Sequence, residues 1–377
     1  MTVSMDPRSL PPVLLLFGGQ SAESDVSVVS GTAIAAALLD AGLRVTQAHI
    51  ARDGSVRELP VGHRRGDVAP ALYTSLSAAG LRNHPPVPLA DYLADVARSA
   101  PSTLVIPALH GPGDEDGTVV AAAARVGLNF VGDLPDVAQL GMDKPRFKAL
   151  AREQGIPTLP ELVVTASAWK LERARILVDI ARFADEQTES GALIGKPAAH
   201  GSSIGMKIAH SAQEWSDAVE EALRFGDRAM LEPYLERARE LEVAVLERAD
   251  GSVVACGPGE VFPGREFYDY DAKYQPGLSR TTTSSDVPAD VAEELRATAQ
   301  LLFTTSGSRG LSRMDFLMAR HGQRAGRWYF SEVNTFPGFT PISLFPALVV
   351  AEGGSFADLC LELVAAAVAR PARNGAA

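Results

Sequence analysis

The chain has 377 residues, of which 46% are hydrophobic and 21% charged. This balance is typical of a soluble globular protein and too apolar for a disordered one, and the length predicts two or three domains. The net charge of −11 disfavours nucleic acid as a partner. Two cysteines are too few for a disulfide framework and fit a reducing compartment. The apolar run 13–17 is too short to span a membrane, so we expect a cytoplasmic protein without a membrane partner.

Short apolar runs alternate with helical patterns over the first third of the chain. The run 13–17 predicts a buried strand, 26–43 a helix with its apolar residues in one stripe, and 45–50 a second strand. The same alternation continues from 89 to 131. Strands that alternate with helices predict a parallel sheet covered on both faces.

The pattern changes after Met142. The middle of the chain reads as a small mixed α+β unit, and the last third has the signals of antiparallel hairpins, including a turn at Asp250-Gly251. The elements predicted here are helices at 144–154, 213–225, 289–303 and 356–369, and strands at 193–197, 204–209, 229–235, 241–245, 253–256, 314–318 and 328–332.

Two polar loops follow predicted strands of the first third. One runs through Gly18-Gly19 to Glu23, and the other is the segment 110–117, in which three glycines and three acids follow His110. Ligands of open α/β sheets bind beyond the carboxyl ends of the strands, where both loops would lie. Each loop also fits a plain turn that caps the next helix, so these patterns alone leave both interpretations open.

A small-residue hairpin tip follows Lys196, which ends a predicted strand. Glycines and serines at 201–205 can lie over phosphate groups and donate backbone N–H and hydroxyl groups. The segment differs from the common NTPase loop because a strand, not a helix, follows it. A flexible hairpin without a ligand remains the alternative.

The most specific pattern lies on two successive strands near the C-terminus. Arg313 and Asp315 share one strand face, and Glu332 and Asn334 share a face of the next strand, because residues two apart point the same way. Carboxylate and amide oxygens are suited to Mg²⁺ that bridges substrate phosphates, and their apolar neighbours disfavour a solvated salt-bridge face. Gly338, in the following turn, could present its N–H to a developing oxyanion.

The segment 266–274 contains three tyrosines, three acids and one lysine, and glycines stand on both sides of it. This composition is too polar for a core and too aromatic for a linker. It predicts either an ordered lid or a structured surface loop.

The order of these motifs resembles that of the D-alanine–D-alanine ligases of the ATP-grasp superfamily, from residue 13 to about 369. The matching segments are 17–27, 110–118, 142–144, 196–205, 266–274, 313–316 and 332–346. The resemblance implies an α/β and α+β three-domain ATP-grasp fold, with an N-terminal parallel α/β domain and nucleotide bound between the central and C-terminal domains. We therefore expect domains at 1–141, 142–233 and 234–377, the last with a lid loop at 264–284.

The resemblance also implies a reaction. ATP phosphorylates the carboxylate of one D-alanine, and the amine of a second displaces phosphate to give D-alanyl-D-alanine for peptidoglycan synthesis. The implied cofactors are ATP and two Mg²⁺ ions, with Mn²⁺ as an alternative. The implied nucleotide-binding residues are Lys144, Lys196, Glu232, Tyr234, Leu235, Glu240 and Lys273, and the implied metal ligands are Asp315, Glu332 and Asn334.

The remaining roles implied by the resemblance concern the substrates. Glu23 and His110 would lie beside the first D-alanine, and Ser343 and Leu344 would hold the carboxylate of the second. Arg313 and the N–H of Gly338 would stabilise the tetrahedral oxyanion, and Glu23, Ser202 and Tyr274 would form the triad that closes the lid. The catalytic set is thus Glu23, His110, Ser202, Tyr274, Arg313 and Gly338. The resemblance also implies a homodimer through the N-terminal domain.

Some positions depart from the family pattern. Ser24 follows Glu23 where the family usually has His or Arg, and Pro341 replaces a frequent serine beside the second-substrate site. These departures motivate an alternative, a paralogous ligase that joins other amino acids in specialised metabolism or antibiotic self-resistance. A catalytically inactive nucleotide-binding protein is disfavoured, because the implied phosphate lysines and metal ligands are all present.

Overall fold

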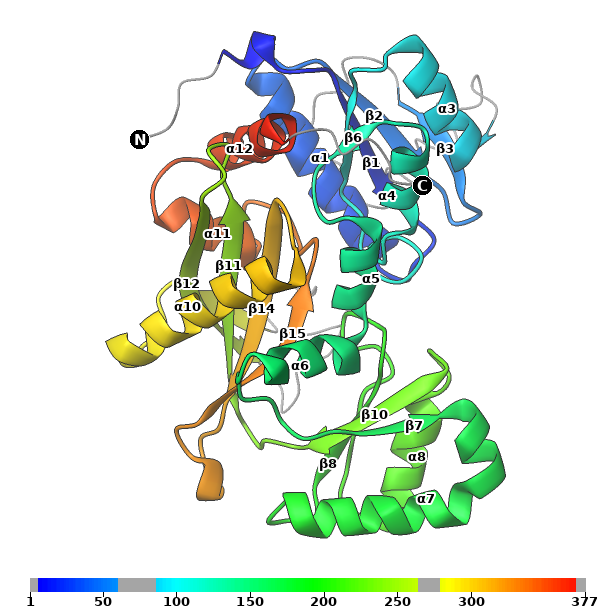
Figure 1. The fold of residues 1–377 in the computed structure, drawn as a ribbon, viewed down its shortest axis with the longest axis vertical. Coiled ribbons are helices and arrows are strands. Elements are labelled where there is room, and N and C mark those ends of the chain that lie inside the picture. The colour runs from blue at the N-terminus through cyan, green and yellow to red at the C-terminus, as the bar shows by residue number, and fades with distance from the viewer. Residues whose placement is uncertain (1–5, 60–85, 264–278, 371–377) are drawn as a thin grey trace.

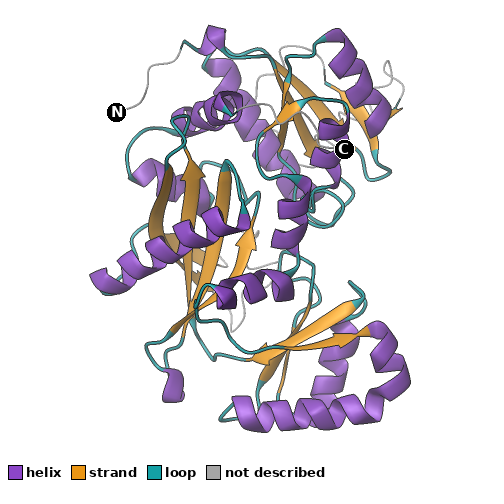
Figure 2. Cartoon of the chain, in the orientation of Figure 1, coloured by secondary structure: helices purple, strands orange, loops and turns teal. Residues whose placement is uncertain are grey.

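Three β-sheets organise the chain in the computed structural model, which describes residues 6–59, 86–263 and 279–370 (Figures 1 and 2). The first sheet has six strands. Four neighbouring strands that include one edge run parallel, as expected, and the two at the other edge form antiparallel pairings. In spatial order these are β4 (Val87–Pro88), β3 (Ser55–Glu58), β2 (Val45–Ile50), β1 (Val13–Gly18), β5 (Leu104–Pro107) and β6 (Asn129–Phe130). Its helices are α1 (Ser24–Asp40), α3 (Leu89–Ser99) and α4 (Thr118–Arg125), and the short η1 (Pro7–Ser9) precedes it.

Strand β1 is buried along its whole length because helices cover both faces of the sheet. Leu15 and Phe17 pack into the core on the side of α1, whereas Leu14 and Leu16 pack into a separate core with α3 and α4. The two sets alternate because successive strand residues point to opposite faces. A continuous apolar run is therefore what this central strand requires.

The second sheet is antiparallel and has four strands: β7 (Leu162–Thr165), β10 (Arg228–Pro233), β8 (Leu193–Pro197) and β9 (Lys207–Ala209), in spatial order. Helices α7 (Ala166–Gln187) and α8 (Ala212–Ala222) lie on one side of it (Figure 1). The 22-residue α7 was not among the predicted elements. Few of its residues are buried, and its helical geometry is interrupted at Glu172, so it lacks a clear apolar stripe.

The third sheet is also antiparallel, as the hairpin signals predicted. Its strands are β13 (Ser279–Thr282), β12 (Val253–Pro263), β11 (Arg239–Glu247), β14 (Leu311–Met318) and β15 (Trp328–Asn334), in spatial order, with η2 (Gly322–Arg324) in the last hairpin. Helix α10 (Ala289–Ser306) packs on one face and α11 (Leu344–Ala351) on the other. Helices α5 (Pro135–Met142) and α6 (Lys144–Glu153) lead from the first sheet to the second.

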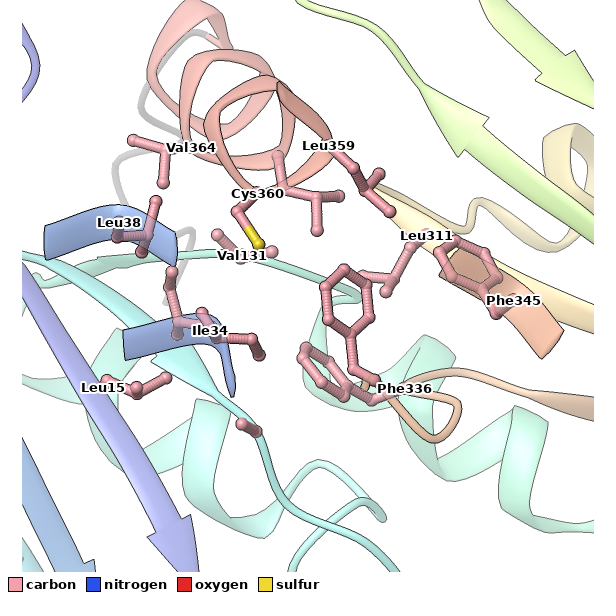
Figure 3. Close-up of a cluster of buried hydrophobic side chains, with 14 of the residues drawn as sticks. Leu15, Ile34, Leu38, Val131, Leu311, Phe336, Phe345, Leu359, Cys360 and Val364 are labelled. Atoms are coloured by element: carbon pink, nitrogen blue, oxygen red, sulfur yellow. The ribbon is translucent and has the colours of Figure 1, made fainter. Parts of the chain in front are cut away.

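One hydrophobic core joins the first sheet to the third (Figure 3). Ile34 and Leu38 of α1 meet Cys360 and Val364 of the last helix, α12 (Phe356–Ala369), and the same core continues to Phe336 after β15. Each sheet lies within one of the three expected domain ranges. Those ranges remain a proposed division, because the C-terminal helix shares a core with the N-terminal sheet.

Both cysteines are buried core residues, as expected. Burial raises the pKa of the Cys256 thiol to about 11 and raises that of Cys360 still further. Neither thiol is therefore activated as a nucleophile.

Within the described ranges, no single helix is long and apolar enough to cross a membrane. Helices α11 and α12 pass that test only as a pair, with a bend of 95° between them. Their apolar side chains belong to the core described above.

We expect Leu38→Ala to lower the free energy of unfolding by about 2–5 kcal/mol, because Leu38 is fully buried and its removal leaves a cavity between α1 and α12. The matched control is Leu171→Ala on α7, where the side chain is 80% exposed and the change should stay within about 0.5 kcal/mol. Urea denaturation of both variants measures the difference. Equal stabilities would contradict the shared core.

Candidate active site

A cavity of about 790 Å³ opens between the second and third sheets. Strands β8 and β10 supply one wall, and β11, β12, β14 and β15 supply the other. The expected nucleotide- and metal-binding residues that line it are Lys144, Lys196, Glu232, Tyr234, Leu235, Glu240, Asp315 and Glu332. The fold thus brings together side chains that are far apart in the sequence.

Glu232, on β10, lies between two buried lysines. Its Oε2 is 2.5 Å from Nζ of Lys196, and its Oε1 accepts a hydrogen bond from Nζ of Lys148. Burial opposes the charge on Glu232, but Lys196 and Lys148 outweigh it and lower the pKa of the carboxyl. Burial likewise opposes the charge on Lys196, but Glu232 and Glu332 raise its pKa. Glu232 and Lys196 therefore both remain ionised.

Lys144 connects three elements at the rim of this cluster. It begins α6, its Nζ donates a hydrogen bond to the His200 carbonyl at 2.5 Å, and Nζ is 3.2 Å from Oε2 of Glu332 on β15. Its backbone N–H also donates to the Ala198 carbonyl at 3.0 Å. This holds the hairpin tip between β8 and β9 against the carboxylates of the third sheet.

The β14–β15 ladder gathers the predicted metal ligands and Arg313. Asp315 is paired with Glu332, and Arg313 with Asn334. Nε and Nη2 of Arg313 donate to the two oxygens of Asp315 at 2.7 and 2.8 Å, and Nδ2 of Asn334 donates to Asp315 at 2.9 Å. Burial would lower the pKa of Arg313, but Asp315 and Glu242 raise it well above its ordinary value, so Arg313 stays charged.

This donor set fits magnesium rather than a metal held by protein ligands alone. The described part of the chain has no group of three or more His, Cys, Asp or Glu side chains placed to hold a metal. Asp315 and Glu332 supply carboxylates on the cavity wall, with the Asn334 amide beside them. Mg²⁺ typically binds one or two carboxylates and completes its shell with substrate phosphates and water. Two carboxylates and an amide therefore fit it.

Glu23 meets the hairpin tip of the second sheet from the loop after β1. Ser202 donates its hydroxyl hydrogen to Oε1 of Glu23. Ser202 has a φ of +50° and Ser203 a φ of +58°, which is uncommon outside glycine and marks a strained tip. Oε2 of Glu23 is buried without a hydrogen-bond partner in the described residues, and a Cβ on Gly111 would come within 2.6 Å of it. This oxygen can accept a small cationic group such as an ammonium.

His110 ties the first sheet to the turn after β15. Its Nδ1 is 3.1 Å from the Phe336 carbonyl and its Nε2 is 3.1 Å from Oγ of Ser30, which accepts from the N–H of Phe339 at 3.2 Å. Burial lowers the pKa of His110, so the imidazole is neutral at pH 7. With Nδ1–H donating to Phe336, the histidine fixes the turn that carries Gly338.

Ser343 and Leu344 stand at the start of α11. The Ser343 hydroxyl accepts from the N–H of Thr340 at 3.1 Å, and the Leu344 side chain is buried in the shared core. Leu344 can therefore meet a substrate carboxylate only through its backbone N–H at the helix N-terminus. A Cβ built on Gly338 would lie 3.5 Å from Oγ of Ser343. The residue expected to stabilise the oxyanion and the residue expected to hold the second substrate are therefore neighbours.

Lys273 and Tyr274, with most of the expected lid loop at 264–284, lie outside the described residues. Only its end is described, where residues 279–282 form β13. The contacts implied for Lys273 and Tyr274 stay predictions.

Two buried charged residues of this region were not singled out from the sequence. Lys148 lies four residues after Lys144 on α6, a spacing that repeats on one helix face but does not distinguish a buried lysine from an exposed one. Asp114 was noted only as part of an acidic loop. Its Oδ2 accepts from the N–H of Ser21 at 3.1 Å, and a Cβ on Gly19 would collide with it at 2.2 Å. Asp114 thus anchors the loop that carries Glu23.

A three-sheet fold with a lysine- and carboxylate-lined cavity between its second and third sheets is that of an ATP-grasp enzyme. Two family models match the chain: "D-ala D-ala ligase N-terminus" over residues 12–133 and "D-ala D-ala ligase C-terminus" over residues 150–365. The chain belongs to the D-alanine–D-alanine ligase family, which confirms the resemblance seen in its motifs, and it is a ligase.

Relatives from several bacteria support this assignment. The chain is 35% identical to a D-alanine–D-alanine ligase of Methylobacterium sp. (strain 4-46), covering 96% of this chain and 92% of the relative. It is 33% identical to that of Corynebacterium urealyticum, covering 94% and 97%. A solved structure of the ligase from Coxiella burnetii has a TM-score of 0.74 at 25% identity and covers 95% of this chain and 94% of that one.

We expect Asp114→Asn to change how stability depends on pH. Burial raises the pKa of Asp114 from 3.8 to about 6 against the hydrogen bonds from Ser21 and Gln20. The folded state therefore holds the proton more tightly than the unfolded chain, and stability falls as the pH rises from about 4 to about 6. The variant should lack this loss and gain on the order of 1–2 kcal/mol relative to wild type over that range, after allowance for solvent screening.

Urea denaturation of both proteins at pH 4, 5, 6 and 7 measures this difference. Asp95→Asn is the control, because that side chain is 66% exposed in a surface pair with Arg98. If the free energies of unfolding of wild type and Asp114→Asn differ by the same amount at every pH, the raised pKa of Asp114 would be contradicted.

Proposed function

We propose that this ligase joins two D-alanines into D-alanyl-D-alanine, with ATP converted to ADP and phosphate through an acylphosphate, for peptidoglycan synthesis. The observation that carries the proposal is that Lys144, Lys196, Asp315 and Glu332 line the same cavity. Phosphoryl transfer needs cations on the transferring phosphate and a site that excludes water. The names of the relatives support D-alanine as the substrate.

The first step is transfer of the γ-phosphoryl group to a D-alanine carboxylate. Lys144 and Lys196 hold the phosphates, while Tyr234, Leu235 and Glu240 along the cavity wall hold the nucleoside. Asp315, Glu332 and Asn334 would hold two Mg²⁺, or Mn²⁺ in their place, which offset the charge of the phosphates when bound. The free oxygen of Glu23 binds the ammonium of the first D-alanine. The substrate carboxylate is thereby oriented towards the phosphate.

The second step is attack of the amine of the other D-alanine on the acylphosphate carbon. The backbone N–H at Leu344 and the Ser343 hydroxyl hold the carboxylate of this second substrate. Arg313 and the N–H of Gly338 stabilise the oxyanion of the tetrahedral intermediate, which collapses with loss of phosphate. His110 keeps the turn at Gly338 in place through its hydrogen bond to the Phe336 carbonyl.

We further propose that the enzyme works in the cytoplasm as a homodimer through its N-terminal domain. The alternative function is a paralogous ligase that joins other amino acids. Pro341 motivates a test of it, because this proline stands beside the second-substrate site where the family frequently has serine.

Phosphate release from ATP in the presence of a panel of D-amino acids tests the proposal. We expect release that requires D-alanine and accompanies D-alanyl-D-alanine, identified by mass spectrometry, while L-alanine supports none. Release driven best by another amino acid would favour the alternative. No release with any amino acid, from a protein that still binds ADP, would contradict a ligase that activates a carboxylate.

We expect Asp315→Asn to reduce turnover at least about tenfold at ordinary Mg²⁺ concentration, because it removes a hard, charged ligand while keeping the size and one acceptor for Arg313. A higher Mg²⁺ concentration should restore part of the loss. Asp179→Asn on α7 is the control, since that carboxylate pairs with exposed arginines on its own helix, far from the cavity residues. Wild-type turnover and an unchanged Mg²⁺ dependence in Asp315→Asn would refute the metal assignment.

A further inference from the structure

Lys148 is a lysine that lies entirely inside the protein, with no exposed surface. Its Nζ donates a hydrogen bond to Oε1 of Glu232 and another to the carbonyl of Leu159 at 2.8 Å, and it is 3.3 Å from Oε2 of Glu161. It therefore joins α6 to the segment that enters the second sheet and to β10. A buried ammonium persists only with partners of this kind.

Lys148 does not line the nucleotide cavity, although three of its neighbours do. Glu232, Leu159 and Lys196 all lie on the cavity wall. Lys148 contacts the first two directly and reaches Lys196 through the carboxylate of Glu232. It can therefore affect a bound nucleotide only by placing these groups.

The two carboxylates beside Lys148 differ in whether another cation pairs with them away from the cavity. Glu161 has a second cation, because Nη1 and Nη2 of Arg152 donate to its two oxygens at 2.8 and 2.7 Å. Glu232 has only Lys148 and Lys196 as partners in the described residues. Without the charge of Lys148, Glu161 would still be paired with Arg152. The carboxylate of Glu232 would then have Lys196 as its remaining ion-pair partner among the described residues.

We propose that Lys148 is a positioning residue for nucleotide binding: by sharing the carboxylate of Glu232, it leaves the ammonium of Lys196 able to bind the phosphates of ATP. The inference rests on the proposed function, in which Lys196 is a phosphate-binding lysine. The hydrogen bond from Nζ of Lys148 to the Leu159 carbonyl also fixes the cavity wall.

Lys148→Met tests this, because it keeps the length of the side chain and removes the charge. Lys196 should then be the only cation that pairs with Glu232 in the described residues, so Glu232 should hold its ammonium more tightly. The affinity for ADP, measured by calorimetry, should fall about tenfold, as is typical when directly coupled groups are separated. The KM for ATP should rise with it, while the KM for D-alanine should change less than about twofold. Lys148→Arg keeps the charge and should retain most of the affinity.

The decisive comparison is a double-mutant cycle with Glu232→Gln. If Lys148 acts through the charge of Glu232, Lys148→Met should change ADP affinity less than about twofold in the Glu232→Gln background. Equal effects of Lys148→Met in both backgrounds would overturn the proposal and indicate a role in general stability. Thermal unfolding of each variant establishes the temperature at which all are folded.

Lys148→Gln is the second variant, for the case in which Lys148→Met does not fold. It can still donate to the Leu159 carbonyl and lacks the charge, so it should show the same loss of ADP affinity and the same dependence on Glu232. Wild-type ADP affinity in a folded Lys148→Met or Lys148→Gln protein would contradict the inference alone. Absence of ADP binding by the wild-type protein would contradict the proposed function instead.

Discussion

The arrangement of this ligase depends on one constraint: a charge that leaves water must find an opposite charge inside the protein. Lys144, Lys196, Arg313 and Lys148 are all largely buried, and each has a carboxylate partner. Those carboxylates come from β10, β14 and β15, so the pairing also fixes how the second and third sheets enclose the cavity. The groups that bind phosphate and metal in the proposed reaction are therefore also ion-pair partners of one another.

The second constraint is mechanical. The loops that carry Glu23 and His110 follow strands of the first sheet. Lys144 begins α6 and Lys196 lies on the second sheet, while Arg313 and Asp315 lie on the third. The apolar core shared by α1 and α12 holds the first and third sheets together, and the hydrogen bonds of His110 align the turn at Gly338 with it. The hydrogen bond from Ser202, in the β8–β9 hairpin of the second sheet, to Glu23, in the loop after β1, links the second sheet to the first. Rigid supports of this kind allow reacting groups to be placed accurately.

Much of the fold could be predicted because local patterns and long-range packing agree. The apolar run of β1 is buried on both faces, and Ser355, the N-cap of α12, forms a capping box with Asp358 that marks the start of the helix. Helix α7 was missed because its exposed Leu171 and Val178 blur the periodicity that burial normally imposes. Its packing against α8 is a tertiary effect that a local pattern does not contain.

The site could be predicted only in part, because local patterns do not show which distant segments the fold brings together. Strand alternation places Arg313 and Asp315 on one face of their strand and Glu332 and Asn334 on one face of theirs, and the β14–β15 register brings the two pairs together. The burial of Lys148 could not be predicted in this way, because its partners Glu161 and Glu232 come from segments whose proximity is set by the fold of the second sheet.

Transfer of oxygen from substrate to phosphate tests the central claim most directly. In the proposed reaction the carboxylate oxygen of the first D-alanine attacks the γ-phosphorus. The amine then adds to the acyl carbon, and the carbon–oxygen bond to phosphate breaks when the tetrahedral intermediate collapses. D-alanine labelled with ¹⁸O in its carboxylate should therefore give one ¹⁸O atom in the phosphate released for each D-alanyl-D-alanine formed. Unlabelled phosphate, formed together with the dipeptide or without it, would contradict an acylphosphate in this cavity.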